Sequence, residues 1–197
     1  QAEKDFVLVL LDFPRDKSKM TEQTIAQNDK LSTQYGISSY PTVIVADAQG
    51  KPLAYTAFFR GSIDEHVASL VEARDGGRKN LAGIKEAMAL AGEEKAAKLE
   101  AALKDFPAGA ILNFFKAELD AIAGADPANS FAKKIRNEAA FGALENSLGP
   151  ALEKFDFAGA LATIKKVTEE NQFEGTSLQR AHFYEAIVTA SMGKVDE

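Results

Sequence analysis

A proline opens an apolar run in YGISSYPTVIV, residues 35–45, and this proline is the most informative residue of the sequence. Proline has no N–H to donate to a sheet, so Pro41 must lie at the first residue of a strand or in the turn leading into it. The bond between Tyr40 and Pro41 is also of the kind that can be cis at modest cost. We therefore expect a special backbone loop directly before a buried strand.

Residue types that perform catalysis are scarce in this sequence. It has no cysteine, which excludes disulfides and thiol chemistry within these residues. His66 and His182 are far apart in helical sequence, where an isolated histidine is more often a surface or structural residue than a base. There is no phosphate-binding glycine loop, serine nucleophile elbow or cluster of metal ligands. We predict no catalytic residue, no metal site and no cofactor in this chain.

Composition restricts the partners. The chain has 197 residues, 46% of them hydrophobic, which is enough for a substantial core in one domain or two. A net charge of −6 with scattered basic residues argues against a nucleic-acid partner. No apolar run approaches the roughly 20 residues of a membrane helix, and residues 1–5 lack the features of a signal peptide. We therefore predict no membrane span.

The first part of the sequence alternates strand and helix patterns. FVLVLL, Phe6–Leu11, is continuously apolar, which is typical of a strand covered on both faces. The pattern over Thr21–Gln34 predicts a helix, with Gly36 as a left-handed cap. PTVIVAD and PLAYTAFF, separated by the glycine turn AQGK, predict an antiparallel hairpin. The order so far is strand, helix, strand, strand.

A second helix follows, and after it the composition changes. Ser62 and Glu65 have the spacing of a capping box before an apolar face. The segment RDGGRK, residues 74–79, predicts a boundary, and the sequence beyond it is alanine-rich with helical periodicity. We expect an α/β domain over residues 1–75 and an all-α domain over residues 80–197.

The all-α region carries apolar stripes at helical spacing. EEKAAKLEAALKDF and GAILNFFKAELDAIAG each place aliphatic and aromatic residues on one face, which indicates helix packing rather than a cofactor pocket. FDFAGA, from Phe155, and GKVDE, from Gly193, are similar turn-to-helix sequences about 38 residues apart. They resemble degenerate tetratricopeptide hairpins, and a plain helical bundle is an equal alternative.

The order of elements up to residue 74 resembles the last two-thirds of a thioredoxin-like domain. YGISSYPTVIV, the DAQGK turn and FFRGS before the last helix carry the resemblance. VLLDFPR and AQNDKLSTQYGI are also similar to exported multidomain thioredoxin-like proteins of bacteria. The resemblance implies a partial thioredoxin-like α/β sandwich, followed by a helical bundle or helical-hairpin repeats. It also implies a periplasmic or other extracytoplasmic location.

In that family the proline at the position of Pro41 is cis, and the residue before it offers its backbone to an extended substrate. The resemblance therefore implies that Ser39, Tyr40 and Pro41 bind peptide or protein substrate. The first strand, first helix and Cys-x-x-Cys of the family are missing from this sequence. We accordingly expect a fragment of a thiol–disulfide oxidoreductase that is inactive alone. Two alternatives remain open: a redox-inactive peptide-binding module, and a scaffold whose helical region binds a protein partner.

The missing strand would lie between the segments at Phe6–Leu11 and Thr42–Val45. Bare apolar edges tend to pair. The two segments could pair directly, with a second copy in a homo-oligomer, or with an upstream segment that is absent from this sequence, and we expect one of the first two.

Overall fold

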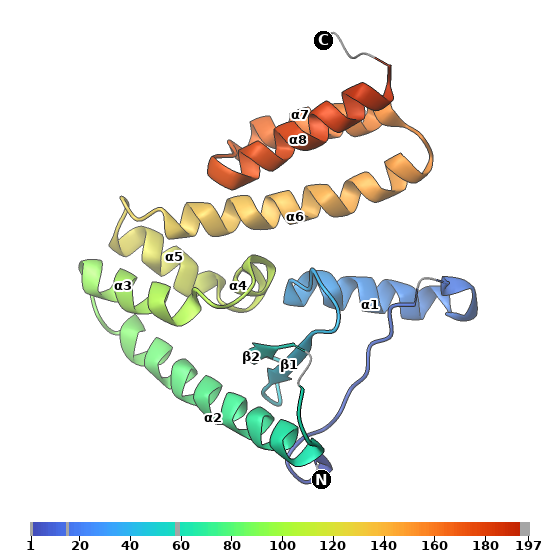
Figure 1. Cartoon of the computed structure of the whole chain (residues 1–197). Helices are drawn as coiled ribbons and strands as arrows, with labels where there is room; N and C mark the ends of the chain where they lie inside the picture. The colour runs from blue at the N-terminus through green and yellow to red at the C-terminus, as the bar shows by residue number, and fades with distance from the viewer. Residues whose placement is uncertain (1, 15, 58–59, 194–197) are drawn as a thin grey trace. The chain divides into compact units, whose positions relative to one another are not determined.

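A computed structural model of the chain describes residues 2–14, 16–57 and 60–193. The chain forms two compact units, Gln1–Asn129 and Ser130–Glu197, and each is described by itself. The first unit holds a small sheet and helices, and the second holds helices, so the architecture is mixed α/β plus all-α at this coarse level (Figure 1). The elements are the 3₁₀ turns Ala2–Lys4 and Lys17–Lys19, then α1 (Glu22–Tyr35), β1 (Val43–Ala46), β2 (Pro52–Thr56), α2 (Ile63–Met88), α3 (Gly92–Leu103), α4 (Ala108–Phe114), α5 (Lys116–Ala125), α6 (Phe131–Glu153), α7 (Phe157–Asn171) and α8 (Gly175–Ser191).

The predicted hairpin is confirmed. β1 and β2 pair antiparallel, with Val43 opposite Thr56, and the register shifts after Val45. The turn between them is fixed by Asp47, whose carboxylate accepts hydrogen bonds from two backbone N–H groups at 2.9 Å. Gly50 in this turn has a φ of +80°, a conformation that glycine adopts without strain.

The predicted strand at Phe6–Leu11 is wrong. This stretch lies outside any helix or strand, and within the described residues β1 pairs with β2 alone. The direct pairing expected between Phe6–Leu11 and Thr42–Val45 is therefore also wrong. A run that is apolar on both faces becomes a buried strand only when both faces are covered. Here Phe6 alone packs against the hairpin cluster, which is centred on Val45, Leu53 and Leu70.

Helix α1 begins and ends as the sequence predicts. The side chain of Thr21 accepts a hydrogen bond from the N–H of Thr24. Gly36 ends the helix in the left-handed region, with a φ of +66°. Gly36 also lies against the start of α4, where an added Cβ would be 2.8 Å from Cβ of Pro107. One glycine therefore both ends α1 and allows it to approach α4.

Helix α2 begins at the predicted capping box. Ser62 and Glu65 exchange the two reciprocal hydrogen bonds of the box. The backbone N–H and the hydroxyl of Ser62 both donate to the Glu65 carboxylate, which holds the pKa of that carboxyl below its ordinary value. The helix then continues through Gly76 and Gly77 to Met88, so the boundary predicted at residues 75–80 falls inside one helix. The compact units divide after Asn129 instead.

Gly77 in α2 serves packing and does not break the helix. Gly77 is buried where α2 crosses β2, and a Cβ added there would lie 2.4 Å from the carbonyl oxygen of Leu53. The neighbouring Gly76 has open space around it. Glycine at position 77 therefore lets the helix touch the hairpin backbone, as Figure 1 shows for α2 beside β2.

Helices α3, α4 and α5 contain the most fully buried residues of the first unit. The predicted stripe of α3 is buried, and α3 packs against α5 and α2. The second stripe, expected as one helix, is divided into α4 and α5 at Phe115. Its apolar side chains are nonetheless buried together. Residues with no exposed surface here are Leu99, Leu103, Ala110, Ile111, Phe115, Leu119 and Ile122.

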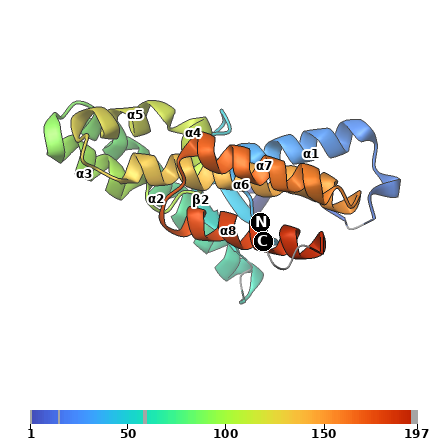
Figure 2. The ribbon, with the colours of Figure 1, turned by 90° about the horizontal axis from the view of Figure 1, so that it is seen from above.

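The second unit consists of α6, α7 and α8, which lie side by side (Figures 1 and 2). Its core joins aliphatic residues of all three helices around Phe141. The segment FDFAGA opens α7 as predicted, with the carboxylate of Asp156 accepting a hydrogen bond from the N–H of Gly159. The similar segment expected to open a helix from Gly193 lies almost entirely outside the described residues.

Candidate functional site

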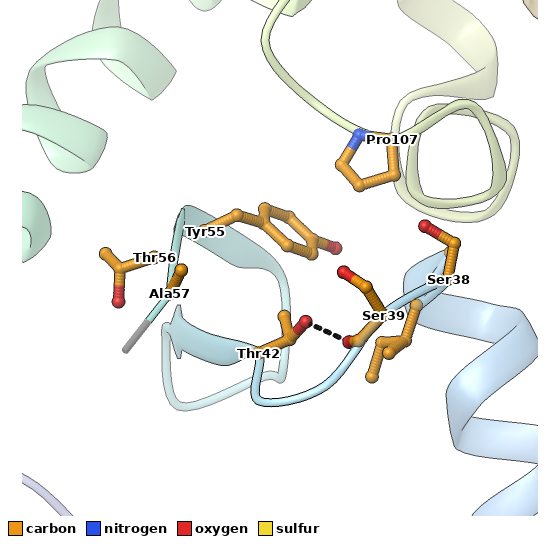
Figure 3. A pocket seen from close by; sticks show the side chains of 9 residues that line it. Ser38, Ser39, Thr42, Tyr55, Thr56, Ala57 and Pro107 are labelled. Carbon is orange, nitrogen blue, oxygen red and sulfur yellow. Dashed lines mark hydrogen bonds between the residues drawn. The ribbon is translucent and has the colours of Figure 1, made fainter. Parts of the chain in front are cut away.

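An open pocket lies where the end of α1, the loop before β1 and the end of β2 meet the start of α4 (Figure 3). Its volume is about 280 Å³. Ligand sites for drug-sized molecules start at roughly 300 Å³, so this pocket suits a side chain or a short stretch of peptide. The lining residues are Gly36, Ile37, Ser38, Ser39, Thr42, Tyr55, Thr56, Ala57 and Pro107.

The loop over residues 37–42 is shaped by the end of α1 and by its own hydrogen bonds. After Gly36, the N–H of Ile37 donates to the carbonyl of Ser32 at 2.9 Å, which turns the chain away from the helix. The hydroxyl of Thr42 donates to the carbonyl of Ser39 at 2.6 Å, as Figure 3 shows. The peptide bond between Tyr40 and Pro41 is cis, in agreement with the expectation from the sequence.

Two tyrosines tie this loop region to the hairpin. The hydroxyl of Tyr55 donates to the carbonyl of Tyr35 at 2.8 Å, and the hydroxyl of Tyr35 donates to the carbonyl of Gly50 at 2.7 Å. Burial raises the pKa of Tyr55 well above its ordinary value. Burial and the nearby charge of Asp47 raise the pKa of Tyr35. Both phenols therefore stay neutral and act as hydrogen-bond donors, not as bases.

The predicted site residues are close together but do not all line the pocket. Ser39 lines it, whereas Tyr40 and Pro41 stand beside it and are exposed to solvent. The ring of Tyr40 lies 4.9 Å from the ring of Phe13, centroid to centroid. Two exposed residues, one of them aromatic, thus stand together beside the pocket.

Sequence reasoning missed the opposite wall of the pocket. Tyr55 and Pro107 come from β2 and from the start of α4, far from the loop in sequence. The alternation in PLAYT, which puts Tyr55 on the face opposite its neighbours, is a signal that could have identified it. Nothing local to Pro107 indicates that it meets the end of α1.

The described residues form no cluster of metal ligands at this site. They contain no group of three or more His, Asp or Glu side chains that could hold a metal ion. His66 and His182 belong to α2 and α8, in separate units. His182 lies 3.5 Å from the carboxylate of Glu185, three residues further along α8. What the pocket offers is a set of hydroxyls and backbone groups that can donate and accept hydrogen bonds.

Comparison of the chain with protein-family models, curated proteins and solved structures finds no match. Function is therefore inferred from the geometry of the pocket and its loop. Among the helices of residues 2–14, 16–57 and 60–193, none is both long and apolar enough to cross a membrane.

Proposed function

We propose that the first unit binds an extended peptide or protein segment along the loop of Ser39, Tyr40 and Pro41. The observation that carries this proposal is the position of the loop. It is exposed, it borders the pocket, and it leads directly into β1. Within the described part of the chain, β1 pairs with β2 only, so its other edge has no strand partner.

Peptide binding along this loop and the edge of β1 would be an example of strand addition. An extended segment gains affinity from main-chain hydrogen bonds and specificity from pockets that take alternate side chains. Backbone groups of the loop and the open edge of β1 would supply the hydrogen bonds. The pocket would take one side chain, with the hydroxyls of Ser38 and Ser39 at its rim. The exposed ring of Tyr40 would cover the next apolar residue of the ligand.

This proposal can be tested by NMR titration with extended, cysteine-free peptides that carry apolar side chains at alternate positions. We expect shifts of the amide signals of Ser38, Ser39, Thr42 and Tyr55, with smaller changes in the second unit. Shifts confined to α6–α8 would show that the helical unit is the binding part and would contradict the proposal.

Replacing Tyr40 with alanine is expected to weaken peptide binding about tenfold or more, because exposed aromatic residues at the centre of an interface commonly dominate its affinity. Phe183 on α8 offers a matched control, since it is 62% exposed and Tyr40 is 60% exposed. Calorimetric titration of the Tyr40→Ala and Phe183→Ala variants should show a loss of affinity in the first alone. Equal affinity of both variants would remove Tyr40 from the site.

A second candidate function is that of a thiol–disulfide oxidoreductase at an extracytoplasmic location, with its cysteines outside these 197 residues. The order of α1, β1, β2 and α2, with α2 packed on the hairpin, supports it. Apart from the strand expected at Phe6–Leu11, which is not formed, it is the order implied by the resemblance to the last part of a thioredoxin-like domain. The gene sequence upstream of Gln1 decides the matter, since this function requires a Cys-x-x-Cys pair there.

Under either function, the 197-residue chain is expected not to accelerate the reduction of insulin by dithiothreitol. Disulfide exchange requires a thiolate, and the sulfur atoms of this chain all belong to methionine thioethers, which cannot exchange. A turbidity assay with thioredoxin as the positive control measures this. A rate above the uncatalysed background would mean that another group performs the reaction.

A further inference from the structure

The hydroxyls that line the pocket divide into hydrogen-bond acceptors and donors. Those of Tyr55 and Thr42 already donate their protons to backbone carbonyls, at 2.8 Å and 2.6 Å, so each can only accept a bond from a ligand. The hydroxyls of Ser38 and Ser39 make no hydrogen bond to any described residue, so their protons are free to be donated. The oxygen of Thr56 is buried and does not reach a ligand in the open pocket. The pocket thus offers two acceptors and two donors.

These groups lie around one space. In Figure 3 the hydroxyls of Ser38, Ser39 and Tyr55 point into the space beneath Pro107, and Thr42 lines the same pocket. The four groups come from the loop after α1 and from β2, which the bond from Tyr55 to the end of α1 ties together. A single ligand group that enters the pocket can therefore reach donors and acceptors at once.

The pocket offers no opposite charge to a charged ligand. Among the described residues, those that line it include no charged side chain. The N–H groups of the first turn of α4 could attract an anion, but they lie against the end of α1. A Cβ added at Gly109 would be only 3.1 Å from the carbonyl oxygen of Thr33. A carboxylate or ammonium group would lose part of its hydration here and gain no counter-ion, which favours a neutral ligand group.

A carboxamide matches this arrangement. The side chains of asparagine and glutamine are neutral and carry two N–H donors and an oxygen with two lone pairs. The N–H groups would donate to the hydroxyls of Tyr55 and Thr42, and the oxygen would accept from those of Ser38 and Ser39. An alkyl side chain would cover the same hydroxyls without bonding to them, which costs affinity. A serine or threonine side chain has one proton to donate and would satisfy only part of the set.

We propose that the pocket selects peptides by binding the carboxamide side chain of an asparagine or glutamine residue. This inference rests on the peptide-binding function proposed above and adds the class of residue that the ligand carries. The ligand would then combine a carboxamide residue in the pocket with a neighbouring apolar residue under the ring of Tyr40.

Three peptides that differ at one residue test this selectivity on the 197-residue chain. Each is cysteine-free, is blocked by acetyl and amide groups at its ends, and has apolar residues on both sides of a central asparagine, aspartate or leucine. These three side chains are close in size and differ in charge and hydrogen bonding. Calorimetric titration should show the asparagine peptide binding about tenfold more tightly than either of the others, which corresponds to one or two net hydrogen bonds.

The outcomes separate this inference from the peptide site itself. Equal affinities, or tighter binding of the aspartate or leucine peptide, together with amide shifts at Ser39 and Thr42, would overturn the carboxamide selectivity and leave the peptide site in place. No binding of any peptide, or shifts confined to α6–α8, would contradict the peptide site and the selectivity with it.

Variants of the pocket test whether the serine hydroxyls carry the selectivity. The double variant Ser38→Ala, Ser39→Ala removes both donors and should bring the affinity for the asparagine peptide close to that for the leucine peptide. Ser191→Ala is the matched control, because it removes an exposed serine hydroxyl from α8 and should keep the tenfold preference. A preference that survives in the double variant would overturn the assignment. So would the absence of nuclear Overhauser contacts between the carboxamide protons of the bound peptide and the ring of Tyr55.

Discussion

Replacing Gly77 with alanine is expected to lower the free energy of unfolding of the first unit by about 2 kcal/mol, within the range seen when a packed site is overfilled. The new Cβ would lie 2.4 Å from the carbonyl oxygen of Leu53 and 2.6 Å from its Cβ. Helix and hairpin would have to separate, because the nearest atoms belong to backbone that cannot rotate away.

Gly76→Ala is the matched control for this substitution. A Cβ at position 76 meets nothing within 4 Å, so alanine there should stabilise the helix by about 0.5–1 kcal/mol. Urea unfolding followed by circular dichroism measures both values. Adjacent glycine-to-alanine changes of opposite sign would show that α2 touches the hairpin at position 77. A gain in stability at both positions would show that it does not.

Phe115→Ala should have a larger effect, a loss of about 3–5 kcal/mol from the first unit. Phe115 is completely buried at the junction of α4 and α5. Its ring lies 5.0 Å from the ring of Phe106 and 4.3 Å from the ammonium group of Lys51. Removing the ring leaves a cavity between helices that are held by short connections and cannot fully close it.

The neighbouring Phe114 provides the comparison, because it is only partly buried and contacts the ring of Tyr35. Phe114→Ala should cost clearly less. Thermal unfolding of both variants, with hydrogen exchange to assign each transition, should show the loss in residues 2–129 while the transition of α6–α8 keeps its midpoint. Equal losses from the two variants would contradict the burial that distinguishes them.

Local signals in the sequence were reliable for this protein. The left-handed cap at Gly36, the capping box of Ser62 and Glu65 and the hairpin turn at Asp47 all depend on residues within four positions of one another. Such local contacts do not depend on the tertiary structure of the rest of the chain. The stripes of α3, α4 and α5 were also correct, because helical periodicity records which face is buried.

Signals that depend on distant partners were not reliable. The composition of Phe6–Leu11 is that of a buried strand, yet whether it becomes one depends on a neighbouring strand that the described residues do not supply. Gly77 is of the residue type that predicts the end of a helix, yet its role in packing depends on Leu53, 24 positions away in sequence. In the candidate site, the loop could be predicted but Pro107 could not, for the same reason.

The continuity of α2 also affects how a chain like this could be assembled during evolution. One helix carries the contact of Gly77 with the hairpin and, further along, the contacts with α3. Recombination between genes near residues 75–80 would split those contacts between two ancestors and leave neither with a complete core. Recombination after Asn129 would transfer α6, α7 and α8 as a set with their own core. The helical unit could therefore be gained, lost or exchanged by a lineage while the hairpin and its helices stayed unchanged.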